Sequence, residues 1–173
     1  MQTAVARDTE RPPAPEAGHF HTGDVLTISL GHAVHDTYSA FLAPLLPLFI
    51  EALALSKAEA GLLTTFNQFP SLLQPLIGHL ADRVNLRWLV ILAPGVTAAM
   101  MSLLGIAPSA VAIAVFLSVA GFSSAGLHAI GPVAIGGQAG RYLGRGMSFW
   151  MVGGELGRTI GPLVIVSAVG ALS

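Results

Sequence analysis

The chain has 173 residues, of which 53% are hydrophobic and 10% are charged, and its formal net charge is -1. About a quarter of the residues of ordinary soluble domains are charged, so this composition excludes an ordinary soluble surface and favours a membrane protein. The small net charge and the absence of cysteine argue against a nucleic-acid partner, a disulfide framework and a thiol nucleophile. We expect neither an enzyme nor a cofactor.

Residues 1–23 are polar, mixed in charge and rich in proline, which predicts a disordered cytoplasmic tail. Long apolar runs follow, each near the roughly twenty residues that a helix needs to cross the hydrocarbon core of a bilayer. They predict five transmembrane helices within residues 24–173, at about 24–50, 60–80, 88–106, 110–133 and 147–172. The expected fold class is therefore all-α, a polytopic helical bundle in contact with the lipid bilayer.

The first predicted span carries ionisable side chains on one face. The residues that recur there at helical spacing are Ser29, His32, Asp36 and Ser39. Ionisable groups in hydrocarbon cost a few kcal/mol each, so this face should look into protein or a water-filled cavity. Asp36 is the candidate proton carrier, because a carboxylate can exchange a proton when its surroundings change between dry and wet.

The second predicted span carries a similar stripe, formed by Thr64, Asn67, Ser71, Gln74 and Gly78. Polar side chains within a membrane seek one another or water, so the two stripes predict a bundle with a polar interior. We expect Asn67 and Gln74 to line its cavity. The third span has no ionisable residue and is expected to face lipid along much of its length. The fourth contributes His128, which we place near Asp36.

Two other interpretations of the ionisable residues remain open. They could form a structural hydrogen-bonding cluster that holds the first and fourth helices together. They could also bind a metal, since His32, His35, Asp36 and His128 are plausible ligand types. However, adjacent side chains at 35 and 36 are expected to point in different directions, and the chain has no His-Glu-x-x-His motif. We therefore predict no metal site.

The fifth predicted span combines small residues with two charges. Gly153, Gly157 and Gly161 are spaced four apart, which lets another helix approach closely. Pro162 should disturb the outer half of the span. Glu155 and Arg158 lie three residues apart and can pair on a helix. Because either charge would be costly alone in a membrane, we expect an intramembrane ion pair.

Basic residues in short loops mark the cytoplasmic side of a membrane protein. Arginines fall in the tail, in the turn around residues 78–87 and in an expected loop at 138–146, whereas Lys57 falls on the opposite side. This distribution predicts an integral protein of the plasma (inner) membrane with a cytoplasmic amino terminus.

Four stretches carry a family resemblance. Residues 78–83, GHLADR, with Arg87 following, resemble the signature loop between the second and third helices of the major facilitator superfamily. Three others are similar to the fosmidomycin resistance group of drug exporters within it. These are HAVHDTY at 32–38 continuing to PLLP at 44–47, GFSSAGLH at 121–128, and MVGGELG at 151–157 continuing to GP at 161–162.

The resemblance implies the fold and the function of a transporter. The chain would form the first five helices of a major facilitator fold, and Gly78, Asp82, Arg83 and Arg87 would form a cytoplasmic gating loop. The activity would be proton-coupled efflux of a small molecule or drug, with the small-molecule substrate and protons as partners. The group is usually uncharged at the positions of Glu155 and Arg158, where this chain departs from it.

Members of the superfamily have twelve helices in two halves, with the pathway between the halves. This chain resembles only the first five, so we expect the remainder of the transporter to be required as a further partner. The alternative is a non-transporting membrane protein, or an inactive truncated product, that assembles through the face of Gly153, Gly157 and Gly161.

Overall fold

A computed structural model describes residues 18–172, and no strand occurs within that range. The α-helices are α1 (Thr22–Ser39), α2 (Leu42–Ala52), α3 (Lys57–Gln68), α4 (Gln74–Ala81), α5 (Arg87–Leu103), α6 (Ala110–Ala139) and α7 (Leu143–Leu172). Three short 3-10 helices, Phe69–Leu73, Leu104–Ile106 and Gly140–Tyr142, adjoin them. The predicted all-α fold is confirmed. Most of the predicted tail, residues 1–17, lies outside the described residues.

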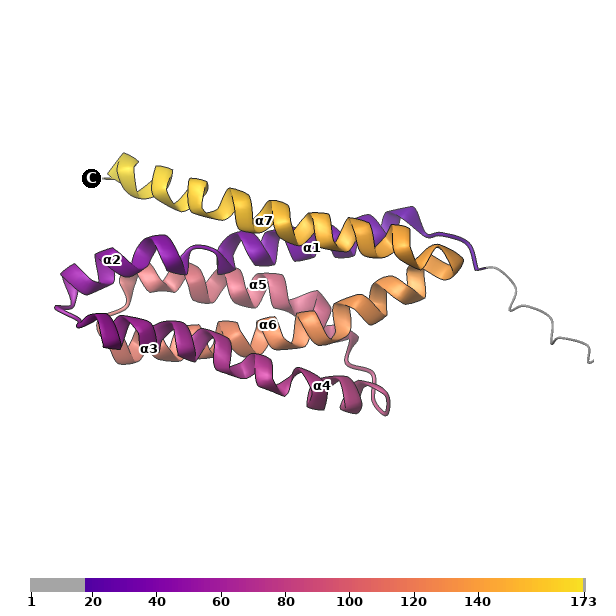
Figure 1. The fold of residues 1–173 in the computed structure, drawn as a ribbon, viewed down its shortest axis with the longest axis horizontal. Coiled ribbons are helices and arrows are strands. Elements are labelled where there is room, and N and C mark those ends of the chain that lie inside the picture. The colour runs from indigo at the N-terminus through magenta and orange to yellow at the C-terminus, as the bar shows by residue number, and fades with distance from the viewer. Residues whose placement is uncertain (1–17, 173) are drawn as a thin grey trace, which may run out of the picture.

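The helices form an up-and-down bundle of elongated rods (Figure 1). There are five rods in the described chain: α1 continued by α2, α3 continued by α4, and the single helices α5, α6 and α7. Successive rods run in opposite directions. α7 lies along α1 in the most extensive helix contact of the described chain. Because the number of rods is odd, the described amino-terminal and carboxyl-terminal ends lie at opposite ends of the bundle.

Prolines explain the breaks within the first two rods. A proline ring clashes with the carbonyl of the residue four positions earlier, so Pro44 disfavours a continuous helix through Ala40. α1 ends at Ser39 and α2 resumes at Leu42. The second rod changes to a 3-10 turn at Phe69–Leu73, which contains Pro70, before α4 begins.

Three described segments are long and apolar enough to cross a membrane, namely Thr22–Ala52, Arg87–Ile106 and Ala110–Ala171, the last of which contains both α6 and α7. The stretch from α3 to α4 is not among them. Asn67, Gln68 and Gln74 lower its hydropathy, although it packs along α6. Its crossing of the membrane remains a prediction.

The segment between α6 and α7 differs from the expected loop at 138–146. α6 continues to Ala139 and α7 begins at Leu143, so the connection is one short 3-10 turn. The reversal occurs at Gly140, whose φ of 53° lies in the left-handed region that favours glycine. The expected loop was too long because the glycine permits a tighter turn.

The last residues of the predicted tail are ordered against this turn. The His21 backbone N–H donates to the Gln138 carbonyl at 2.9 Å. The Phe20 ring contacts the rings of Tyr142 and Phe149, and the Arg145 guanidinium lies 4.4 Å from its centroid. The ordered bundle therefore begins before residue 24, the boundary expected from the sequence.

The apolar core consists of two clusters. One lies among α2, α3, α5 and α6 and includes Phe49, Leu63 and Leu117. The other lies around Val25 and Trp150. α5 supplies Ala93, Thr97 and Met101 to the interior, so only its outer face, where Ile91 and Leu92 are exposed, fits the expected contact with lipid.

Glycines allow α7 to approach α1 at backbone distance. A Cβ atom on Gly153, Gly157 or Gly161 would collide with the backbone carbonyl oxygen of Ser29, Ala33 or Thr37, respectively. The three glycines lie on successive turns of one helix face. This face of α7 is therefore occupied by α1 of the same chain.

We expect Gly157→Ala to destabilise the bundle by about 1–3 kcal/mol, because its methyl group would force α7 away from the Ala33 carbonyl. Gly95→Ala in α5 is the matched control, since a Cβ there would meet nothing within 4 Å. Thermal unfolding of the full chain in detergent measures the difference. Equal stability of the two variants would contradict the close contact of α1 with α7.

Candidate functional site

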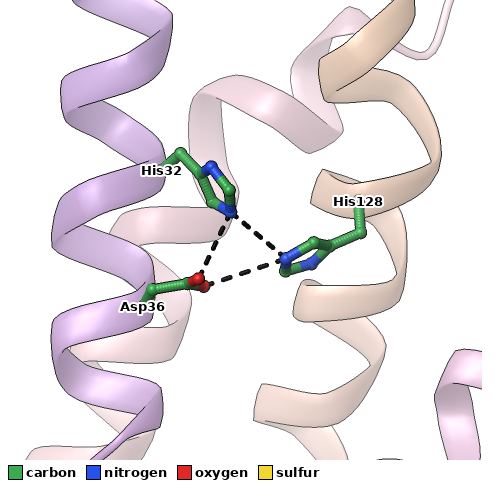
Figure 2. Close-up of side chains that lie close together, drawn as sticks. All are labelled: His32, Asp36 and His128. Atoms are coloured by element: carbon green, nitrogen blue, oxygen red, sulfur yellow. Dashed lines mark hydrogen bonds and ion pairs between the residues drawn. The ribbon is translucent and has the colours of Figure 1, made fainter. Parts of the chain in front are cut away.

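The centre of the site is the carboxylate of Asp36 on α1, which is only 3% exposed. Its neighbours are His32 and His35 of the same helix, His128 of α6 and Arg158 of α7. Figure 2 shows His32 and His128 pointing toward this carboxylate from α1 and α6. The carboxylate is therefore enclosed by three different helices.

The imidazoles are within contact distance of both carboxylate oxygens. His32 Nε2 lies 3.3 Å from Asp36 Oδ2 and 3.3 Å from His128 Nε2. His128 Nε2 lies 3.8 Å from Asp36 Oδ1. His35 Nδ1 donates to Oδ1 of the same carboxylate at 2.9 Å. The expectation that the side chains at 35 and 36 point apart was wrong, because both turn toward the bundle interior.

The tautomers of two histidines follow from their other contacts. His32 Nδ1 lies 3.0 Å from the Trp150 carbonyl oxygen, and His128 Nδ1 lies 2.9 Å from that of Ser124. A carbonyl oxygen only accepts hydrogen bonds, so each Nδ1 must carry a hydrogen and donate it. In the neutral imidazoles, both Nε2 lone pairs then face the Asp36 carboxylate.

Trp150 of α7 fixes the position of His32. The two rings are stacked, with centroids 3.7 Å apart and planes at 15°. The indole is 3% exposed and belongs to the second apolar cluster. The Trp150 ring thus holds one face of the His32 imidazole, and the Trp150 backbone carbonyl binds its Nδ1. Together these contacts limit the directions in which His32 Nε2 can point.

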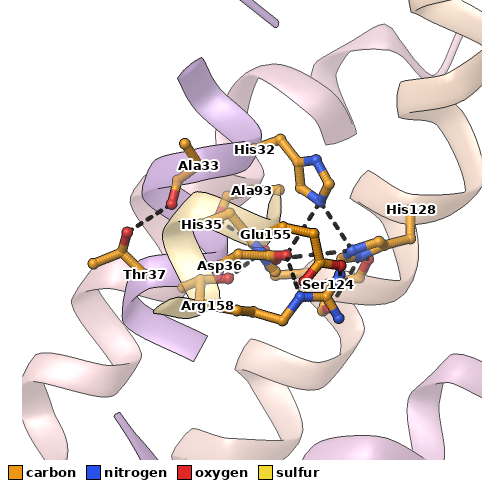
Figure 3. Close-up of polar contacts among 12 residues, drawn as sticks. His32, Ala33, His35, Asp36, Thr37, Ala93, Ser124, His128, Glu155 and Arg158 are labelled. Atoms are coloured by element: carbon orange, nitrogen blue, oxygen red, sulfur yellow. Dashed lines mark hydrogen bonds and ion pairs between the residues drawn. The ribbon is translucent and has the colours of Figure 1, made fainter. Parts of the chain in front are cut away.

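Arg158 of α7 brings a positive charge to the same carboxylate, as Figure 3 shows. Its Nε lies 3.4 Å from Asp36 Oδ2, and its NH2 group lies 3.2 Å from Glu155 Oε1. The Arg158 and Glu155 side chains are 53% and 64% exposed. The predicted pair is therefore present, but Arg158 also bridges from it to Asp36.

A cavity of about 420 Å³ adjoins the cluster. Its lining includes Asp36, His128 and Arg158, with Asn67, Gln68 and Ser71 from the second rod. The polar stripes of the first two rods thus meet the fourth and fifth at one hollow. Asn67 lines it as expected, and so does Pro162. Gln74 is not among the residues that line it.

The gating-loop residues lie at a different place. Asp82, Arg83 and Arg87 line a second cavity of about 640 Å³ at the turn between α4 and α5, opposite Gln138 of α6. Gly78 lies one turn earlier, on α4. This cavity shares no lining residue with the cavity beside Asp36, and a gating role for it remains a prediction.

The sequence did not indicate the contacts of His35, Trp150 and Arg158 with the cluster. A partial signal was present, since an acidic residue in the first span and a basic one in the fifth each need a partner. Nothing in the spacing along the chain shows that α1 and α7 are neighbours, which is what pairs Asp36 with Arg158.

The comparison with protein families identifies the class of protein. The family model of the Major Facilitator Superfamily matches residues 28–173 of the sequence. The chain therefore belongs to this superfamily of membrane transporters. The resemblance seen in its signature loop is confirmed. No solved structure matches the chain.

Two curated relatives are similar to this chain. The fosmidomycin resistance protein of Escherichia coli (strain K12) is 30% identical over 139 residues, which cover 79% of this chain and 34% of the relative. The uncharacterized MFS-type transporter YfnC of Bacillus subtilis (strain 168) is 28% identical over 143 residues, covering 81% and 34%. The chain thus spans about a third of the length of these relatives.

We expect Trp150→Ala to destabilise the protein by about 3–5 kcal/mol, because it removes a buried ring that supports both the second apolar cluster and His32. Trp88→Ala is the matched control, since that ring is 54% exposed. The measurement is thermal unfolding in detergent. A loss as large in Trp88→Ala would show that the stacking on His32 has no special role.

Proposed function

We propose that this chain is the amino-terminal part of a proton-coupled exporter of small molecules. Membership of the major facilitator superfamily supports transport across a membrane. The observation that carries the finer proposal is the buried Asp36 carboxylate, which lies at the wall of a polar cavity and contacts three histidines. This arrangement joins a proton-binding group to a space large enough for a small molecule.

The proton role follows from the contacts of the carboxylate. Asp36 has Arg158 on one oxygen and imidazoles on both, so a proton bound there changes the charge balance of the whole cluster. Protonation weakens the attraction to Arg158, which is half exposed and can turn toward Glu155 or the cavity. Proton uptake would thereby alter the polarity of the cavity wall, and substrate would be exchanged for inward protons.

Export rather than uptake is supported by a relative. The name of the Escherichia coli protein, 30% identical over the matched region, is fosmidomycin resistance protein. A membrane transporter confers resistance most directly by expelling the compound. We therefore propose that the complete transporter exports a drug-like molecule. The complete transporter would include the part of the relatives that this chain does not cover.

The orientation and gating are proposed on the same basis. Arg83 and Arg87 lie at the turn after α4, and Arg145 lies beside the turn between α6 and α7, at the same end of the bundle (Figure 1). Basic turns favour the cytoplasm, so this end and the amino terminus would be cytoplasmic in the inner membrane. Asp82 and Arg83 would then close the cytoplasmic side during transport.

We expect Asp36→Asn to abolish proton-driven transport and to leave membrane insertion intact, because the amide keeps the shape of the side chain but cannot carry a proton. The complete gene product is expressed in a bacterial host, and drug efflux is followed against an imposed pH gradient. Asp24→Asn, an exposed carboxylate of the same helix, is the control. Unchanged pH-dependent efflux in Asp36→Asn would remove Asp36 from the mechanism.

The alternative of a non-transporting protein assembled through the glycine face is not favoured. The backbone of α1 already occupies the positions facing Gly153, Gly157 and Gly161. A partner helix would have to displace α1 and expose the Asp36 cluster to lipid, which is costly for an ionisable group.

A further inference from the structure

We propose that His32, Asp36 and His128 form a binding site for a zinc-like divalent transition-metal ion on the wall of the cavity. The three side chains offer two imidazole nitrogens and a carboxylate, whose ligand atoms all lie within 4.8 Å of one another. This inference goes beyond the proposed transport activity, and metal binding is measured without a transport assay.

The ligand atoms are spaced nearly as a tetrahedral metal ion requires. Two ligands that are each about 2.0 Å from a tetrahedral zinc ion lie about 3.3 Å apart. His32 Nε2 lies 3.3 Å from both Asp36 Oδ2 and His128 Nε2, and His128 Nε2 lies 3.8 Å from Asp36 Oδ1. These two contacts to the carboxylate use different oxygens, so the carboxylate and His128 would both shift to bring one oxygen and two nitrogens to three corners of a tetrahedron.

The lone pairs of the ligand atoms also point toward one another. Because both Nδ1 atoms donate to backbone carbonyls, the two Nε2 atoms approach each other and a carboxylate without a hydrogen between them in their neutral forms. Three acceptors facing one another are repulsive unless a positive charge lies among them, which is either a metal ion or a proton on one imidazole. Histidine ligands of metal ions are typically oriented by such hydrogen bonds from the second ring nitrogen.

His35 supports the carboxylate in the same way. Its Nδ1 donates to Asp36 Oδ1 at 2.9 Å, while its side chain is fully buried. This hydrogen bond turns the carboxylate toward His32 and His128. His35 itself is not needed as a metal ligand. The fourth corner of the site faces the cavity, where water or a bound molecule can complete the coordination.

Arg158 competes with the ion for Asp36. Its Nε lies 3.4 Å from Oδ2, so a metal must displace this contact. Glu155 provides a second anchor 3.2 Å from the Arg158 NH2 group, and the arginine side chain is half exposed. Arg158 can thus withdraw to Glu155 when the ion binds, which predicts that removing the arginine strengthens metal binding.

The ligand set selects the metal. Imidazole suits zinc, cobalt, nickel and copper, whereas magnesium and calcium prefer oxygen ligands alone. We therefore use Co²⁺ as the probe, because its visible absorption is intense in tetrahedral sites and weak in octahedral water. The chain has no cysteine, so no thiol contributes to the spectrum.

The experiment titrates Co²⁺ into the full chain, purified in detergent with an affinity tag that contains no histidine. We expect one equivalent to give tetrahedral absorption that Zn²⁺ abolishes and Mg²⁺ does not. His128→Ala should lose this absorption. His79→Ala, which removes a histidine of α4 outside the cluster, should retain it. Circular dichroism verifies that each variant is folded.

We expect Arg158→Gln to bind Co²⁺ about tenfold more tightly than the unmodified chain. A folding defect would weaken binding, so it could not produce this result. Any one of three results would overturn the proposed site. These are no tetrahedral absorption in the unmodified chain, retained absorption in His128→Ala, and unchanged Co²⁺ affinity in Arg158→Gln.

Discussion

The structure depends on the neutralisation of one buried carboxylate. Asp36 is enclosed by α1, α6 and α7, and an isolated carboxylate within a membrane would cost several kcal/mol. The Arg158 guanidinium and the Nδ1–H of His35 stabilise it instead, and the imidazoles of His32 and His128 face it. These groups come from three helices, so the carboxylate gains its partners only when the helices have assembled. The same enclosure places it at the wall of a polar cavity.

The close approach of α7 to α1 makes this arrangement possible. Gly153 and Gly157 bring the two backbones together, and between them Gly154 lies directly against His32 and Asp36. Trp150 and Arg158 then reach the cluster from either side along α7. Larger residues at these glycines would separate the helices and withdraw both groups. Helix packing and the chemistry of the site are therefore parts of one constraint.

The sequence predicted the helices and part of the cluster. Helical periodicity places His32 and Asp36 on one face, and the cost of ionisable groups in a membrane brings His128 toward them. The pairing of Asp36 with Arg158 was not predictable, because it requires knowing that α1 and α7 are neighbours. The contact of His35 depends on its rotamer, which spacing does not determine. The short turn at Gly140 was missed for a similar reason, since a polar stretch does not reveal how tightly it folds.

The most direct test of this account is nitrogen NMR of the histidine side chains, with the signals of His32 and His128 assigned by single substitutions. The account predicts that Nδ1 carries a hydrogen in both residues, because each donates to a backbone carbonyl and leaves Nε2 facing Asp36. A hydrogen on Nε2 together with a bare Nδ1 in either residue would contradict it. The cluster would then be a closed hydrogen-bonded network rather than a cation-binding centre.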